Sequence, residues 1–144
     1  MLRKCIRASL FAAFGMMAVL LAYGSVGATP ADEKKDEKLP DISEIMLKGH
    51  KGTDAYMAKI KGAAKDGQWE DAQKYAKTLA VFGDALGKNK APKGDEKSWK
   101  ALTEKYATNT KTVLKATEDK DAKAVNAGLG DIGKSCGGCH SKHK

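Results

Sequence analysis

The chain has 144 residues, of which 42% are hydrophobic and 31% charged, and its formal net charge is +8 at pH 7. This length suits one small globular domain and leaves little room for a second. The lysines are scattered among Asp and Glu, so we interpret them mainly as solvated helix faces, with guidance of an acidic partner as the alternative. Because the chain has no basic stripe, no nucleic-acid partner is expected.

Residues 1–28 have the pattern of a secretory signal peptide. A start with three cations is followed by an uncharged apolar stretch over 8–23, and Val26-Gly27-Ala28 supplies the small residues of a cleavage site. The alternative is an uncleaved anchor helix, because about 18 apolar residues can span a bilayer. Cleavage lowers the net charge from +8 to +5, removes Cys5 and leaves no stable membrane insertion. The predicted location is the periplasm, where paired cysteines form a disulfide, bind a metal or enter another covalent bond.

The predicted mature chain begins with a charged segment and continues as a series of helices. Residues 29–39 are dominated by charge, and we predict a disordered leader there. From residue 40 onward the pattern is helical, and no segment shows the alternation of a strand. A first helix is predicted from Asp41, where Asp41-x-x-Glu44 resembles a capping box, to Asp66. The stretch Gly49-His50-Lys51-Gly52 is a candidate for a kink or a break in it.

Three further helices are predicted by apolar spacing and by their end signals. The second covers about 68–86 and is stopped by Gly87, and the third begins near Asp95 after a loop that contains Pro92. Asp119 to Asp121 separates the third from the fourth. Four helices with short connections predict an all-α fold, an antiparallel four-helix bundle over residues 40–144. Its Ala- and Gly-rich faces are expected to leave room for a large group between the helices.

The fourth helix carries an unbroken apolar stripe that runs into two cysteines. Successive members are separated by four, three, four and three residues: Val125, Leu129, Ile132, Cys136 and Cys139. A helix presents residues i, i+3 and i+4 on one face. We therefore expect Cys136, Cys139 and His140 to face the interior.

Cys136-Gly-Gly-Cys139-His140 has the spacing of the attachment signature of c-type haem. Each thiol can add to one vinyl group of a porphyrin, and the adjacent imidazole can reach the iron as its proximal ligand. The motif predicts one covalent haem c per chain, with His140 bound to the iron. No other catalytic constellation is visible, so we do not expect an enzyme.

Three alternatives use the same residues without haem. A redox dithiol normally lies at a helix N-terminus, where the dipole lowers the thiol pKa, whereas this pair closes the last helix. A zinc site would combine Cys136 and Cys139 with two of His50, His140 and His143. A disulfide between cysteines three apart in a helix would close a small, strained loop.

With these residues in place, the region from about Pro40 to Lys144 resembles the class II cytochromes c, the cytochrome c′ and cytochrome c-556 family. The resemblance rests on a single Cys-x-x-Cys-His near the C-terminus of an exported four-helix chain. It implies that Cys136 and Cys139 bind haem and that His140 is the axial ligand. The family usually has a cation four residues after that histidine, where Lys144 stands here, and often an aromatic before it, where this chain has His143.

The resemblance also bears on the sixth position of the iron. Ile45-Met46-Leu47-Lys48 is similar to the Leu-Met-Lys of the methionine-ligated members, so Met46 is the predicted sixth ligand. The alternatives are that Met46 only fills core, that His50 one turn later is the ligand, or that the position is open. The family often has an arginine near a haem propionate. Residues 29–144 contain no arginine, and lysines such as Lys48 would act there as point charges.

The predicted function is electron transfer by iron that cycles between Fe(III) and Fe(II), with redox proteins as partners, acidic ones among them. The alternative is a five-coordinate haem that binds NO or CO, as in cytochrome c′. A zinc-binding or dithiol protein is the remote alternative. Related bundles often pair through their first two helices, so a homodimer is a further expectation of the resemblance.

Overall fold

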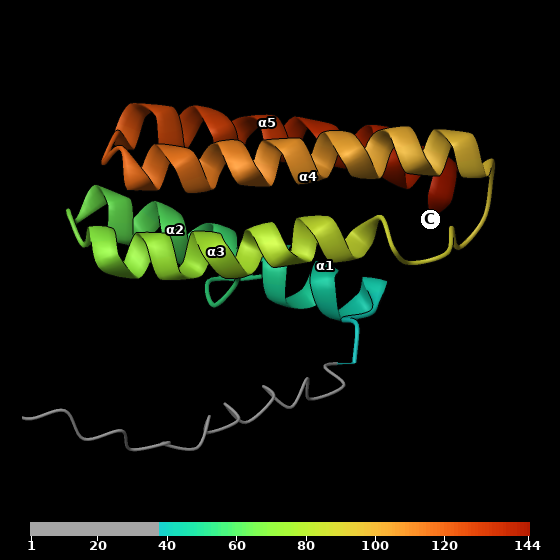
Figure 1. Cartoon of the computed structure of the whole chain (residues 1–144), viewed down its shortest axis with the longest axis horizontal. Coiled ribbons are helices and arrows are strands. Elements are labelled where there is room, and N and C mark those ends of the chain that lie inside the picture. Colours follow the sequence, from blue (N-terminus) through green and yellow to red (C-terminus); the bar gives the residue numbers. More distant parts are fainter. Residues whose placement is uncertain (1–37) are drawn as a thin grey trace, which may run out of the picture. The chain divides into compact units, whose positions relative to one another are not determined.

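The computed structural model describes residues 38–144; the predicted signal peptide and all but the last two residues of the predicted leader lie outside the described residues. This part of the chain contains five α helices (Figure 1). They are α1 (Ile42–His50), α2 (Tyr56–Lys65), α3 (Trp69–Leu86), α4 (Glu96–Glu118) and α5 (Ala122–His143). Among these helices, none combines the length and the apolar character needed to cross a membrane.

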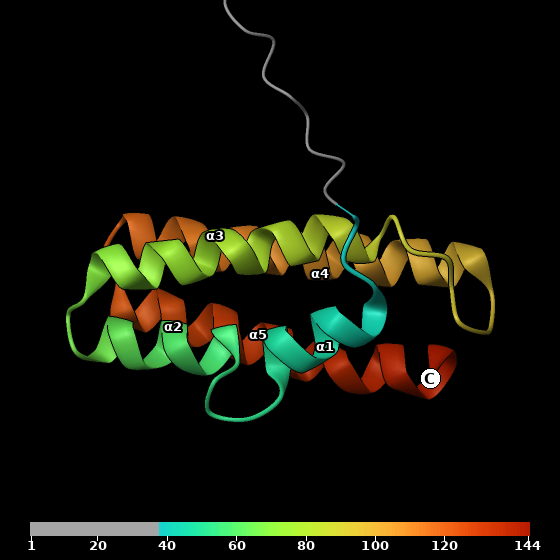
Figure 2. The ribbon, with the colours of Figure 1, turned by 90° about the horizontal axis from the view of Figure 1, so that it is seen from below.

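The helices form an all-α bundle in which α1 and α2 together take the place of one long helix. α2 packs against α3 and α5, α3 packs against α4, and α4 packs against α5, so the contacts close into a ring (Figures 1 and 2). α1 packs against α2 and α3. The predicted four-helix bundle is confirmed, with a first helix that is divided in two.

The division of the first helix follows from its glycine. α1 ends at His50, Gly52 has a φ of +86°, and α2 begins after Ala55. A positive φ costs glycine little and other residues more, so the chain can leave the helix at this point. At the other end of α1, Asp41 accepts a hydrogen bond of 2.8 Å from the backbone N–H of Glu44. The predicted capping box is only half formed, because the Glu44 carboxylate accepts instead from Lys48 Nζ at 2.6 Å.

Glycines let the long helices approach closely. A Cβ on Gly83 of α3 would collide with Thr110 Oγ1 of α4, and a Cβ on Gly128 of α5 would lie 2.8 Å from Val113 Cγ2. Both distances are too short for a real side chain. The expectation that the small faces leave room for a large group is therefore wrong at these positions, where the neighbouring helix fills the space.

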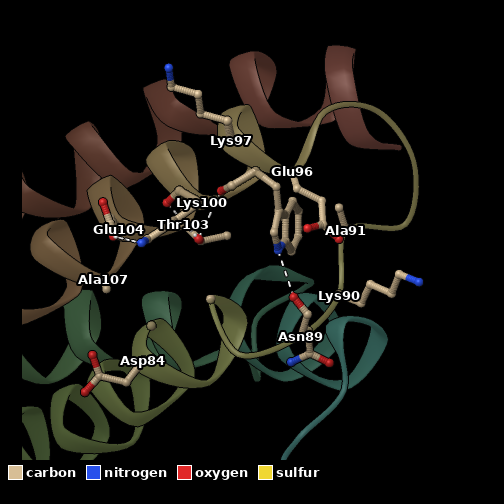
Figure 3. A pocket seen from close by; sticks show the side chains of 13 residues that line it. Asp84, Asn89, Lys90, Ala91, Glu96, Lys97, Lys100, Thr103, Glu104 and Ala107 are labelled. Atoms are coloured by element: carbon tan, nitrogen blue, oxygen red, sulfur yellow. Dashed lines mark hydrogen bonds and ion pairs between the residues drawn. The ribbon is translucent and has the colours of Figure 1, made fainter.

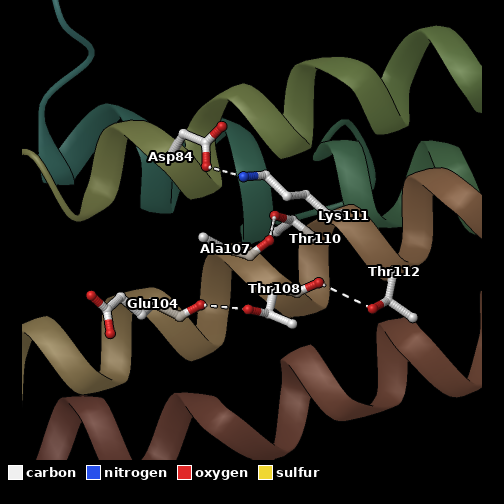
Figure 4. A network of polar contacts seen from close by, with 7 residues as sticks. All are labelled: Asp84, Glu104, Ala107, Thr108, Thr110, Lys111 and Thr112. Carbon is white, nitrogen blue, oxygen red and sulfur yellow. Dashed lines mark hydrogen bonds and ion pairs between the residues drawn. The ribbon is translucent and has the colours of Figure 1, made fainter.

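Polar contacts on the outer surface of α3 and α4 are local. Lys111 Nζ lies 2.7 Å from Asp84 Oδ1 and joins the two helices, while Thr108 and Thr112 donate to carbonyls one turn earlier in α4 (Figure 4). Both charged side chains are about half exposed, so the pair contributes little to stability. The bundle is held mainly by its apolar core, of which Ile45, Leu79, Val113 and Ile132 are fully buried members.

Candidate functional site

A small cavity lies where α1, α4 and the last turns of α5 meet. It encloses about 60 Å³. Its walls combine sulfur, imidazole and phenol groups with apolar side chains. They are Met46 and His50 of α1, Leu86 of α3, Trp99, Leu102 and Tyr106 of α4, and Ser135, Cys136, Cys139, His140 and His143 of α5. All four residues predicted to bind haem or iron thus border one cavity.

The two thiols lie on the cavity side of α5, and both are half-buried. Cys136 Sγ is 3.5 Å from the carbonyl of Ile132, one turn earlier, and Cys139 packs against the apolar core. Burial, and to a smaller extent the neighbouring Cys136, raises the pKa of the Cys139 thiol above its ordinary value. A raised pKa keeps the thiol protonated, whereas reactive dithiols depend on a lowered one. The environment of Cys139 therefore does not favour the dithiol alternative.

His140 borders the cavity but is exposed, so the prediction that it faces the interior is wrong. Consecutive residues of an α helix are separated by about 100° around its axis. Because Cys139 continues the buried stripe of Val125, Leu129 and Ile132, His140 lies at the edge of that stripe. The imidazole is thus placed at the rim of the cavity, beside the two thiols.

Met46 and His50 face the cavity from α1, one helical turn apart. Met46 is half-buried and packs against the core, whereas its neighbour Leu47 is exposed. His50 makes two polar contacts: its Nδ1 lies 2.9 Å from Met57 Sδ, and its Nε2 lies 2.8 Å from Tyr106 Oη. A thioether has no proton to donate, so Nδ1 carries the hydrogen and the Tyr106 hydroxyl donates to Nε2. Burial, and in the same sense the nearby His140, lowers the pKa of His50, which agrees with a neutral ring.

Tyr106 is a further member of the site and was not among the residues predicted to bind haem or iron. It is buried on α4, and burial, with a smaller contribution from Cys136, raises the pKa of its phenol well above the ordinary value. The hydroxyl therefore keeps its proton and acts as a donor to His50. The sequence contained a signal for this role. Tyr106 follows Trp99 and Leu102 on the same helix face, so it is expected to be buried, and a buried tyrosine hydroxyl needs a hydrogen-bond partner.

His143 is fully committed to structural contacts. It is 3% exposed; its Nδ1 donates to the carbonyl of Lys93 at 2.8 Å, and its Nε2 accepts from the Ser98 hydroxyl at 3.2 Å. With both nitrogens used, His143 has no free position for zinc. Within residues 38–144, no group of three or more His, Cys, Asp or Glu side chains is arranged to hold a metal ion.

A wider groove of about 630 Å³ runs along the surface between the end of α3 and the start of α4 (Figure 3). Trp99 borders both this groove and the small cavity, and its Nε1 donates to the carbonyl of Asn89 at 2.8 Å. Lys90, Lys97 and Lys100 line the groove together with acidic side chains. None of the four predicted site residues lies in it.

The donor set around the small cavity fits covalent haem. Two thiols three residues apart can form the two thioether bonds, and an imidazole adjoins the second thiol. Leu86, Trp99 and Leu102 supply apolar surface for the porphyrin. Pockets for small ligands usually measure about 300–1,000 Å³, so haem binding requires the side chains between α1 and α5 to move apart.

Comparisons with known proteins agree with this donor set. A family model described as Cytochrome C' matches residues 93–144, a little over a third of the chain, and this region includes α4, α5 and the Cys-x-x-Cys-His motif. Searches of curated proteins and of solved structures give no match. Residues 93–144 are therefore similar to the cytochrome c′ family, whose typically periplasmic members bind haem c covalently and carry electrons or bind small gases rather than act as enzymes.

Proposed function

We propose that this protein is a monohaem electron carrier in which Cys136 and Cys139 bind the haem, His140 is the proximal ligand and Met46 the distal ligand. The observation that carries the proposal is that these four side chains, contributed by α1 and α5, border one cavity. Haem c supplies an iron centre that accepts and releases one electron. A thioether ligand favours the reduced iron and raises its potential relative to a second imidazole.

The protein attaches the haem, excludes water from the cavity and allows electrons to be exchanged at the surface. The thiols of Cys136 and Cys139 are consumed in the thioether bonds, so haem cannot be lost by dissociation. Leu86, Trp99 and Leu102 keep water from the inner side of the cavity. Exposure of His140 supports electron exchange at the rim of the site.

The ligand assignment is tested by the spectrum of the exported holoprotein. The wild type is expected to be low-spin, with the weak far-red band of a methionine–Fe(III) bond. Met46→Ala should make the ferric iron high-spin, whereas Leu47→Ala, which changes the exposed neighbour, should leave the spectrum unchanged. A high-spin wild type that binds CO when reduced would instead support the five-coordinate gas-binding alternative. A colourless protein with the mass of the bare polypeptide would contradict both.

Charge supports a redox partner with an acidic docking surface. The lysines at 142 and 144 are exposed and follow His140 directly, and residues 29–144 carry a net charge of +5. Exchange with anionic hexacyanoferrate(III) should therefore slow as salt screens the charges. Lys142→Glu with Lys144→Glu should slow it further, and the same change at Lys61 and Lys65 in α2 should have a smaller effect. Equal effects of the two pairs would argue against a docking surface beside the haem.

The proposed periplasmic location requires export of the chain and cleavage of the signal peptide. Cleavage after Ala28 would leave a chain that begins at Thr29, without the cysteine at position 5. Mass spectrometry of the protein from the periplasmic fraction should give the mass of residues 29–144 plus one haem. A mass that retains residues 1–28 would support the anchor alternative.

A further inference from the structure

We propose that Tyr106 determines which side chain of α1 becomes the sixth ligand of the iron, because its hydroxyl occupies the one nitrogen of His50 that could coordinate. This inference rests on the proposed function and adds a positioning residue to it. Met46 and His50 of α1 border the same cavity one turn apart. Either side chain could therefore bind the iron as its sixth ligand.

The hydrogen bonds of His50 decide between the two. Nδ1 holds the ring hydrogen and points it at Met57 Sδ, so only the Nε2 lone pair can bind a metal. That lone pair accepts the hydroxyl hydrogen of Tyr106 at 2.8 Å. Iron can bind His50 only when this hydrogen bond is given up. The thioether sulfur of Met46 carries no hydrogen, so its lone pairs remain available to the iron.

Burial of Tyr106 makes loss of the contact with His50 unfavourable. Its ring is 6% exposed and lies with its centroid 5.6 Å from that of the His50 imidazole. A buried phenol that loses its partner leaves an unsatisfied hydroxyl, which is unfavourable away from water. The cost of separating the two side chains therefore opposes ligation by His50, and neutral Tyr106 remains a donor because burial raises its pKa.

The test compares spectra and reduction potentials of holoproteins. Tyr106→Phe keeps the ring and removes the hydroxyl, so we expect His50 to replace Met46, with loss of the far-red band, a bis-histidine electron paramagnetic resonance signal and a lower potential. The double variant Tyr106→Phe, His50→Leu should recover the far-red band. Tyr75→Phe is the matched control, since Tyr75 is half-buried on α3 and does not border the cavity, and it should change nothing.

The outcomes separate this inference from the proposed function. If the wild type shows methionine ligation and Tyr106→Phe retains both the band and the potential, the role of Tyr106 is wrong and the electron carrier stands. If the wild type is already bis-histidine, Tyr106 does not hold His50 away from the iron, and the inference is overturned. If Tyr106→Phe holoprotein becomes high-spin instead of bis-histidine, the inference is also overturned. Circular dichroism melting of each variant confirms that the helices are intact when the spectra are recorded.

Discussion

The imidazole of His143 lies edge-on to the indole of Trp99, with ring centroids 5.3 Å apart and an angle of 69° between the rings. The pair joins the last turn of α5 to the first turns of α4. His143 Nδ1 donates to the carbonyl of Lys93 in the loop between α3 and α4, and the hydroxyl of Ser98 in the first turn of α4 donates to His143 Nε2, so both contacts fasten the same turn. Because His140 lies one turn before His143, these contacts fix the part of α5 that carries the proposed proximal ligand.

Replacement of His143 should therefore loosen the end of α5. His143→Ala removes a buried ring and leaves the Ser98 hydroxyl and the Lys93 carbonyl without this partner, so we expect a loss of about 2–4 kcal/mol in the free energy of unfolding. His143→Phe keeps an aromatic contact with Trp99 and should cost less. Denaturant unfolding of the holoproteins measures both, with the exposed Lys142→Ala as control. Equal stability of His143→Ala and Lys142→Ala would show that the contacts do not anchor the helix.

The close approach of α3 and α4 gives a second prediction. A Cβ at position 83 would collide with Thr110 Oγ1 and lie 3.1 Å from Ala107 Cα, which is backbone and cannot rotate away. Gly83→Ala should destabilise the fold by about 1–3 kcal/mol, and Thr110→Ala should restore only part of this loss. Gly130→Ala is the matched control, because it lies within α5 and a Cβ there meets nothing within 4 Å. It should stabilise the protein by about 0.5–1 kcal/mol, as helical Gly→Ala changes do. Thermal unfolding that fails to separate the two variants would contradict the packing described.

Local signals allowed the helices to be predicted, and long-range packing limited what could be predicted of the site. Asp41, Asp95 and Asp121 each cap a helix by accepting hydrogen bonds from backbone N–H groups a few residues later in the chain. A short stretch of sequence is therefore sufficient to predict where each of these helices begins. Gly52 likewise marks the break in the first helix. The same local spacing located the two thiols on the apolar stripe of α5.

The rest of the site depends on how the helices are rotated against one another. His140 lies one residue step beyond Cys139 on α5, and spacing alone did not show that this step takes it out of the interior. The contact between His50 and Tyr106 joins residues 56 positions apart in the sequence. No local pattern pairs an imidazole of α1 with a phenol of α4, so this contact became visible only once the helices were packed.

Capping of the last helix gives a third prediction. Asp121 accepts hydrogen bonds of 2.9 Å from the backbone N–H groups of both Lys123 and Ala124. Asp121→Ala leaves these groups to water and should cost about 1 kcal/mol of unfolding free energy. Asp131→Ala removes only an exposed contact with Lys134 within α5 and should change stability by less than about 0.5 kcal/mol. Urea unfolding of the two variants compares them directly, and the prediction is wrong if Asp131→Ala is the more harmful change.

The buried imidazole of His50 makes stability depend on pH. It faces Met57 and Tyr106, and burial places its pKa in the folded protein below the ordinary 6.5. As pH falls through 6.5 the unfolded chain binds a proton at this histidine before the folded chain does, so the equilibrium shifts toward the unfolded state. The stability that neutral His50 provides is thus fully present above the unfolded pKa and is lost as pH falls through the folded one. Unfolding free energies of the wild type and His50→Leu, measured between about pH 7.5 and pH 5, should converge toward acid if this is correct. Parallel curves for the two proteins would mean that His50 titrates equally in both states, and that its ring is not held neutral by the contacts described.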